Sequence, residues 1–288
     1  AFSVFSALFT TDPSHPDLPL WEERTFVLLH DYPDPFLTIR SAIMLAQHAF
    51  LGGRYKRIGE VRAALDAHPV IANAPPYARY MAFAVSLYDD LVRFDHGALA
   101  AGFAASRACA EETGARIMDG HYALDLASDA ILRGEMRQAA AILEGVAAKT
   151  PPEHYNLAGH LHMIQAWAAA RNGDPARLRA HAALLAQAAE GFCCVGYRVA
   201  AQVAEAIADV LEGGTDGISA PAAPKLSCDD FPFPLPRIHA GLLAASVALG
   251  RGDREACLAS LAVALPLWAR ESPGYLTFAV PKILAPLC

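Results

Sequence analysis

Apolar stretches of helical length alternate with short polar turns along almost the whole chain. The turns share a glycine or an aspartate and fall at a nearly constant interval. The successive steps between them are 42, 39, 39, 40 and 39 residues, taking as markers Gly53, Asp95, Gly134, Gly173, Gly213 and Gly252. A constant interval of this length is typical of a helical repeat array. The sequence therefore predicts an all-α protein built from stacked antiparallel helix pairs, an α-solenoid with a period of about 39–40 residues.

The residues at the turns suit a helix that stops and reverses. Glycine adopts the positive φ that the residue after a helix often requires. An acidic residue follows at Glu135, Asp174 and Asp253, where it can cap the next helix or interact favourably with its amino end. A small residue at one position of the repeat would allow close helix packing. Alanine lies seven residues before five of the six markers: Ala46, Ala127, Ala166, Ala206 and Ala245.

The pattern divides the chain into three parts. Residues 1–36 are expected to form an irregular entry segment with one short helix at 20–29. Residues 272–288 are expected to form a partial capping helix, and the missing initiator Met indicates a fragment of a longer protein. Residues 37–271 are expected to form six helix pairs, with helices at 37–50 and 55–66, 76–94 and 96–112, 117–132 and 135–149, 153–171 and 175–190, 196–212, and 235–249 and 253–269.

The fifth of these pairs is degraded. Its first helix should be followed by a second, but five prolines at positions 221, 224, 232, 234 and 236 exclude a regular long helix there. A loop at 214–236 is expected in its place. This loop is either a locally decayed repeat or a segment that contacts a partner or acts as a lid.

Composition excludes several functional classes. A net charge of −7 without a basic cluster argues against direct contact with nucleic acid. No apolar run is long enough to cross a bilayer, so no membrane partner is expected. The six cysteines form no CxxC pair, which favours reduced thiols in a cytoplasmic protein. No catalytic motif, metal-ligand spacing or phosphate-binding loop is present, so the sequence predicts no enzyme activity, no metal and no cofactor.

The Gly-Asp turns followed by alanine in the next helix resemble tetratricopeptide (TPR) repeats. The longer period and the entry segment at 8–21 resemble the TPR-like sensor region of MalT-type, LuxR-type bacterial transcription regulators, which belong to the signal-transduction ATPase class. The resemblance implies a right-handed superhelical array that senses a ligand. The ATPase and DNA-binding domains of that family lie outside the array, so a role in transcription regulation is implied by resemblance alone.

Polar residues also recur in register with the markers. Thirteen residues before four markers lie Arg40, His121, His160 and His239. In TPR-like arrays this position belongs to the concave surface, which is where such arrays bind their partners. Alternatively, these histidines cap the edges of the core or bond to a neighbouring carbonyl. The same inner wall is expected to continue through Gln47, Asp89, Tyr122, Ser128 and Trp167.

Two functions follow from these patterns. The first is a non-catalytic sensor whose concave groove binds a small effector and so shifts the regulator between its resting and active forms. The second is a scaffold that binds a peptide, a protein partner or a second copy of the chain, without any small molecule. A deep pocket with convergent polar groups would favour the first, and an open trough would favour the second.

Overall fold

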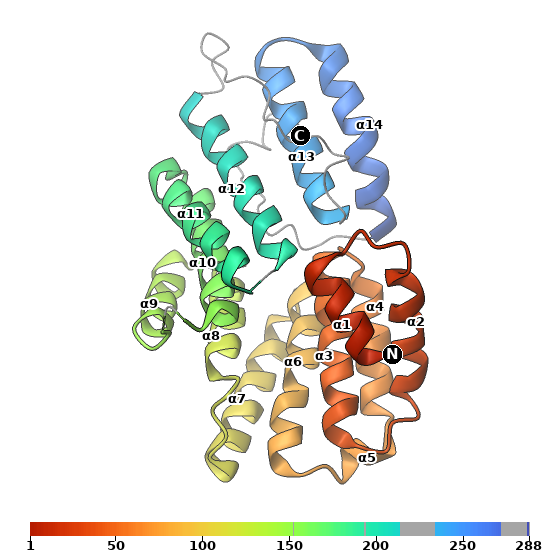
Figure 1. Ribbon diagram of the computed structural model, residues 1–288. Coiled ribbons are helices and arrows are strands. Elements are labelled where there is room, and N and C mark those ends of the chain that lie inside the picture. Colours follow the sequence, from red (N-terminus) through yellow and green to blue (C-terminus); the bar gives the residue numbers. More distant parts are fainter. Residues whose placement is uncertain (152, 193, 214–233, 272–286, 288) are drawn as a thin grey trace. The chain divides into compact units, whose positions relative to one another are not determined.

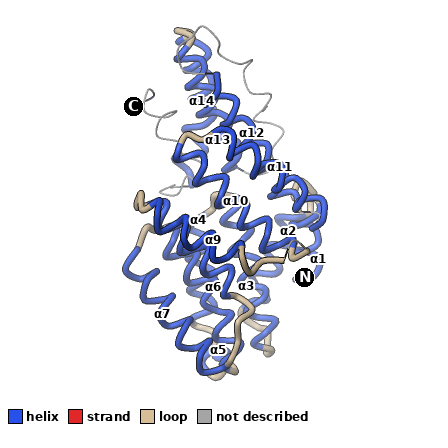
Figure 2. Tube along the Cα trace, turned by 90° about the vertical axis from the view of Figure 1, so that its left-hand side faces the viewer, coloured by secondary structure: helices blue, strands red, loops and turns tan. Residues whose placement is uncertain are grey.

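The computed structural model describes residues 1–151, 153–192, 194–213, 234–271 and 287. The chain divides into two compact units, Ala1–Asp129 and Ala130–Cys288, which are described separately here. Within the described ranges, the regular secondary structure is helical, and the tube in Figure 2 contains helices and loops but no strand. The prediction of an all-α array of helix pairs is confirmed, whereas its right-handed superhelical twist stays a prediction.

The first unit contains seven complete helices and most of an eighth. Proline occupies the first turn of several of them, where its missing N–H costs no hydrogen bond. The helices are α1 (Phe2–Thr11), α2 (Leu18–Leu29), α3 (Pro35–Leu51), α4 (Tyr55–Asp66), α5 (Pro69–Ala72), α6 (Pro76–Val92), α7 (His96–Thr113) and α8 (Asp119–Leu132), the last of which continues into the second unit.

The second unit is also built from paired helices. Its described helices are α9 (Met136–Ala147), α10 (Tyr155–Asn172), α11 (Pro175–Phe192), α12 (Val195–Gly213), α13 (Pro234–Gly250) and α14 (Arg254–Glu271). Residues 214–233 of the predicted loop lie outside the described residues. The last three residues of that loop, 234–236, belong to α13. The predicted capping helix at 272–288 also lies outside the described residues, apart from Leu287, which packs against α13 and α14.

The same packing pattern occurs in both units. In the first unit α3 packs on α4 and on α6, and α4 also packs on α6. In the second unit α10 packs on α11 and on α12, and α11 also packs on α12. In both places a helix pair packs against itself and against the first helix of the next pair, as stacked repeats do.

Five turns within pairs share one hydrogen-bond pattern. At the turn after α10, the Gly173 N–H donates to the Ala170 carbonyl (3.0 Å) and the Asp174 N–H donates to the Ala169 carbonyl (3.0 Å). This is the Schellman motif, in which the residue after the helix has positive φ. The same two bonds close the turns at Gly53, Phe94, Gly134 and Gly252, each of which has positive φ.

The acidic residues at three of these turns stand at the amino end of the next helix, as predicted, and two of them cap it with the side chain. The Oδ1 atoms of Asp174 and Asp253 accept hydrogen bonds from the N–H groups of Arg177 (3.0 Å) and Ala256 (2.9 Å). Glu135 makes no such cap and pairs with Arg133 instead (2.5 Å). The shorter aspartate side chain reaches the N–H three residues ahead, whereas the longer glutamate turns to a neighbouring cation.

Tyrosines connect the first helices of successive pairs. The Tyr122 hydroxyl of α8 donates to the Tyr80 carbonyl of α6 (2.6 Å). The Tyr197 hydroxyl of α12 donates to the Asn156 carbonyl of α10 (2.7 Å). The ring of Tyr197 also lies against Gly159, where any Cβ atom would collide with it. These bonds use the second lone pair of carbonyls that already accept a helical N–H, and they join the first helices of neighbouring pairs.

Two elements differ from the sequence prediction. Residues 1–36 are not an irregular segment, because α1 and α2 pack on each other and on α3. A short helix that the sequence did not predict, α5, follows α4, and the His68 Nδ1 atom accepts from the Val70 N–H at its start (3.2 Å). The helix predicted at 20–29 is present as α2, whereas α5 was not predicted because Pro69, which follows the predicted helix at 55–66, can begin a helix as well as end one.

Candidate functional site

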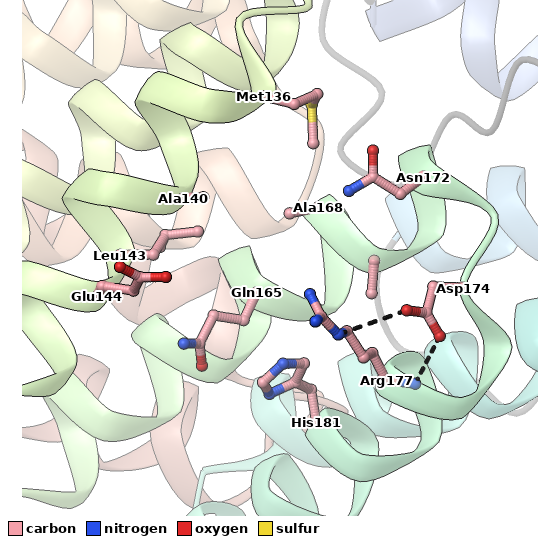
Figure 3. Close-up of a pocket in the computed structure, with 11 residues that line it drawn as sticks. Met136, Ala140, Leu143, Glu144, Gln165, Ala168, Asn172, Asp174, Arg177 and His181 are labelled. Carbon is pink, nitrogen blue, oxygen red and sulfur yellow. Dashed lines mark hydrogen bonds and ion pairs between the residues drawn. The ribbon is translucent and has the colours of Figure 1, made fainter.

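A polar pocket lies in the second unit between α9 on one side and α10 and α11 on the other (Figure 3). Its volume is about 150 Å³. This is the volume of an engineered apolar cavity that accepts a molecule of about six non-hydrogen atoms, such as benzene. The lining residues are Met136, Ala140, Leu143, Glu144, Gln165, Ala168, Ala169, Asn172, Asp174, Arg177 and His181.

Small side chains create the space. Ala140 of α9 and Ala168 of α10 lie on opposite sides of the pocket (Figure 3), Ala169 also lines it, and Met136 and Leu143 add apolar surface from α9. Longer side chains at the alanine positions would fill this volume, because protein interiors otherwise pack to high density. The pocket therefore combines an apolar lining from two helices with polar groups around it.

The turn between α10 and α11 positions the cationic side of the pocket. The Schellman turn at Gly173 places Asp174 at the start of α11. Its Oδ1 atom caps the helix at the Arg177 N–H, and its Oδ2 atom pairs with Arg177 Nε (3.5 Å). His181 follows one helical turn later, so Arg177 and His181 project from the same face of α11.

His181 has a buried nitrogen without a partner. Among the described residues, its Nδ1 atom is shielded from solvent and makes no hydrogen bond. The ring stacks on His162 of α10, with centroids 5.8 Å apart and planes inclined by 25°. Burial, the neighbouring His162 and the charge of Arg177 lower the pKa of His181 to about 4, although Asp174 acts in the opposite direction. The ring is therefore neutral at pH 7.

His162 supports this arrangement from outside the pocket. Its Nδ1 atom lies 3.0 Å from Oε1 of Gln165, which itself lines the pocket. Burial lowers the pKa of His162, while the bond to Gln165 acts in the opposite direction. Because the amide oxygen of Gln165 is engaged by His162, its NH₂ group is the part that remains to face a ligand.

The charges around the pocket have opposite signs on opposite sides. Arg177 lies on α11, and Glu144 lies across the pocket on α9 (Figure 3). Glu144 makes no ion pair within the described part of the chain. The site therefore offers hydrogen-bond donors and a positive charge from α11, and an acceptor with a negative charge from α9.

Three of the residues that the sequence placed on the inner wall of the first unit are buried and form hydrogen bonds within the fold. Asp89 is buried and accepts from Arg62 (3.0 Å) and Arg93 (2.8 Å). Tyr122 is 4% exposed, and its hydroxyl donates to the Tyr80 carbonyl. Ser128 is buried and donates to its own helix at the Leu124 carbonyl (2.9 Å). These side chains fill the core and do not face a groove.

The other predicted residues of the first unit are more accessible. Arg40 is exposed on α3, with its guanidinium 5.6 Å from the ring centroid of Phe2. Gln47 is half-buried, and its amide nitrogen lies 3.5 Å from the Tyr88 hydroxyl. His121 is half-buried on α8. Ligand contact by these three residues stays a prediction.

In the second unit the predicted aromatic and one predicted histidine are buried. Trp167 is 0% exposed and His239 is 5% exposed, so neither presents a surface to a ligand. His160 is half-buried on α10 and stays a candidate. None of the nine predicted residues lines the pocket at His181. Sequence reasoning missed the pocket because it examined first helices only, whereas Arg177 and His181 lie on a second helix.

Two further classes of site were searched for among the described residues. No group of three or more His, Cys, Asp or Glu side chains is placed to hold a metal ion. Within the same ranges, each helix is too short or too polar to cross a membrane. The pocket between α9, α10 and α11 is therefore the candidate functional site.

The chain was compared with models of protein families, with curated proteins and with solved structures. None of the three comparisons found a match, so the functional argument rests on the fold and on the pocket.

Proposed function

We propose that this protein is a non-catalytic binding module, and that its pocket between α9, α10 and α11 takes a small effector. The observation that carries the proposal is the buried, unpartnered Nδ1 atom of His181 beside the pocket that Ala140 and Ala168 line. A buried polar group without a partner costs about 1–3 kcal/mol. A ligand that bonds to this atom would recover part of that cost and so would favour the folded, liganded form.

The resemblance to MalT-type regulators supplies the proposed context. In that context the array is the sensor region of a bacterial transcription regulator, located in the cytoplasm. Effector binding across α9 and α11 would connect two consecutive helix pairs. It would shift the equilibrium between two forms only if one form binds the effector more tightly than the other.

The experiment is a thermal-shift screen of the full chain against small metabolites, followed by calorimetry of each hit on pocket variants. Ala168→Leu adds three carbons to the pocket lining and should abolish binding. The control Ala259→Leu makes the same change at an exposed position on α14. Binding that survives Ala168→Leu would refute this location for the site.

A second candidate function is self-association as a scaffold, and α14 favours it. Leu258, Val263 and Leu265 are 56%, 43% and 46% exposed on this helix. Second helices such as α11 pack against the first helix of a following pair, and a second copy of the chain could cover α14 in the same way. Light scattering after gel filtration should then show a dimer that Leu258→Glu converts to a monomer. A monomer before substitution would exclude this function.

A further inference from the structure

The pocket residues carry complementary charges, and these define the kind of effector that fits. Arg177 and His181 project from α11, while Glu144 projects from α9 on the opposite side (Figure 3). A ligand that lies across the pocket therefore meets Arg177, its partner Asp174 and His181 at one end and Glu144 at the other.

The donor end suits a carboxylate. The one ion pair that the structure gives Arg177 within the described residues uses Nε, which leaves its terminal nitrogens for a ligand. A guanidinium binds a carboxylate through two parallel hydrogen bonds. The neutral ring of His181 lines the same side of the pocket one turn away, and a neutral imidazole carries one N–H donor.

The opposite end suits an ammonium group. Glu144 is exposed at the edge of the pocket and is not neutralised by a cation among the described residues. Because Asp174 already offsets Arg177, the empty pocket carries one uncompensated negative charge, on Glu144. A simple carboxylate would be repelled by this charge, and a simple amine would leave the donors on α11 unused.

The volume limits the size of the ligand. A pocket of about 150 Å³ accepts roughly six to eight non-hydrogen atoms, which is the size range of alanine, serine and valine. The apolar surface from Met136, Ala140 and Leu143 is available to a short side chain.

We propose that the effector is a small zwitterion, an α-amino acid with a short side chain, whose carboxylate binds Arg177 and His181 and whose ammonium group binds Glu144. This inference rests on the proposed function, because it assumes that the pocket binds an effector. It adds the chemical class of that effector and assigns a role to each charged side chain.

The test is calorimetry of the full chain with L-alanine, L-serine and L-valine, each compared with propionate and propylamine. Propionate and propylamine are similar in size to alanine but carry one charge each. At least one amino acid should bind ten-fold or more tightly than either of them. Equal binding of propionate and the amino acid would overturn the proposal.

Two charge-removing variants make the test specific. Arg177→Gln should weaken amino-acid binding at least ten-fold and leave the weak binding of propylamine unchanged. Glu144→Gln should also weaken amino-acid binding at least ten-fold, but should strengthen propionate binding because the repulsion is gone. The matched controls Arg198→Gln and Glu153→Gln change exposed residues outside the pocket lining and should leave all affinities unchanged.

The outcomes separate this inference from the proposed function. If no amino acid binds but another metabolite does, and Ala168→Leu abolishes that binding, the zwitterion inference fails and the binding function stands. If neither amino acids nor any other metabolite binds the folded protein, both fail. Amino-acid binding that is unaffected by both charge variants also overturns the inference, because the charges then have no role.

Discussion

Replacing Gly134 and Gly145 by alanine tests the turn geometry on which the repeats depend. Both glycines lie in open space, where an added Cβ atom would meet nothing within 4 Å. Their backbones differ, because Gly134 has a φ of +79° in the turn before α9, whereas Gly145 lies within α9 itself. The same substitution should therefore have opposite effects at the two positions.

The magnitudes follow from backbone conformation alone. Alanine reduces the conformational entropy of the unfolded chain equally at both positions, which stabilises the fold by about 0.4–1 kcal/mol. At Gly134 the left-handed conformation also costs about 1–2 kcal/mol for a residue with a Cβ atom. Gly145→Ala should thus raise the free energy of unfolding, and Gly134→Ala should lower it. The difference between the two variants is the strain, about 1–2 kcal/mol.

Urea unfolding followed by circular dichroism measures this difference. With a slope of about 2 kcal/mol per molar urea, the two midpoints should differ by roughly 0.7 M. Asn at position 134 is a useful control, because asparagine tolerates positive φ better than alanine does. Equal midpoints for the two alanine variants would show that Gly134 does not need its left-handed conformation, and would refute the turn geometry.

Further predictions concern acid sensitivity, capping and packing. The pKa of His181 is about 4 in the folded chain, against an ordinary value of 6.5. As the pH falls from 6.5 to 4, the unfolded chain therefore takes up a proton at His181 before the folded chain does. Protonation then favours unfolding, and the urea midpoint of the second unit should decrease over this range. A phenylalanine at position 181 should flatten this pH profile, and an unchanged profile would contradict the assignment. Asp174→Ala should cost about 1 kcal/mol through loss of the cap on α11, whereas Asp174→Asn should cost much less, as measured by thermal unfolding. Tyr122→Phe should cost about 1 kcal/mol in the same assay, because the buried hydrogen bond from its hydroxyl to the Tyr80 carbonyl is lost, and a neutral effect would show that this bond contributes nothing to stability.

The sequence predicts the helix pairs well because the signal at the turns is local. The predicted helix at 175–190 corresponds to α11, and the one at 253–269 corresponds to α14, each within two residues. The turn after α6 is the exception, since Phe94 takes the left-handed conformation that glycine takes elsewhere. An aromatic residue gives no sign of that conformation, so the marker was placed one residue late, at Asp95.

The groove was predicted less well than the helices for a physical reason. First helices such as α10 are covered by their own partner and by the next pair, so apolar contacts surround most of the helix. Trp167 shares a repeat position with the polar Gln47, Asp89 and Ser128 of other pairs, yet it is fully buried. Periodicity identifies equivalent positions, but it does not separate the concave face from the faces that pack against neighbours.

The pocket could not be found from the period because it departs from it. His181 lies eight residues after Gly173, whereas the corresponding positions after Gly53 and Gly134 are the apolar Val61 and Ile142. A binding site that occurs once in an array is visible as a deviation from the repeat. A search for polar residues at positions that are apolar in other repeats would have identified His181.

The five Schellman turns also bear on how the chain folds during synthesis. Each turn is closed by hydrogen bonds between residues three and five positions apart, so it forms without any contact from distant sequence. Local contacts of this kind favour rapid folding. A helix pair can therefore close as soon as its second helix leaves the ribosome, and the preceding pair is then already present as its template. Folding would proceed from the amino end, one pair at a time, and translation pauses after a turn would leave a stable array of the pairs already made.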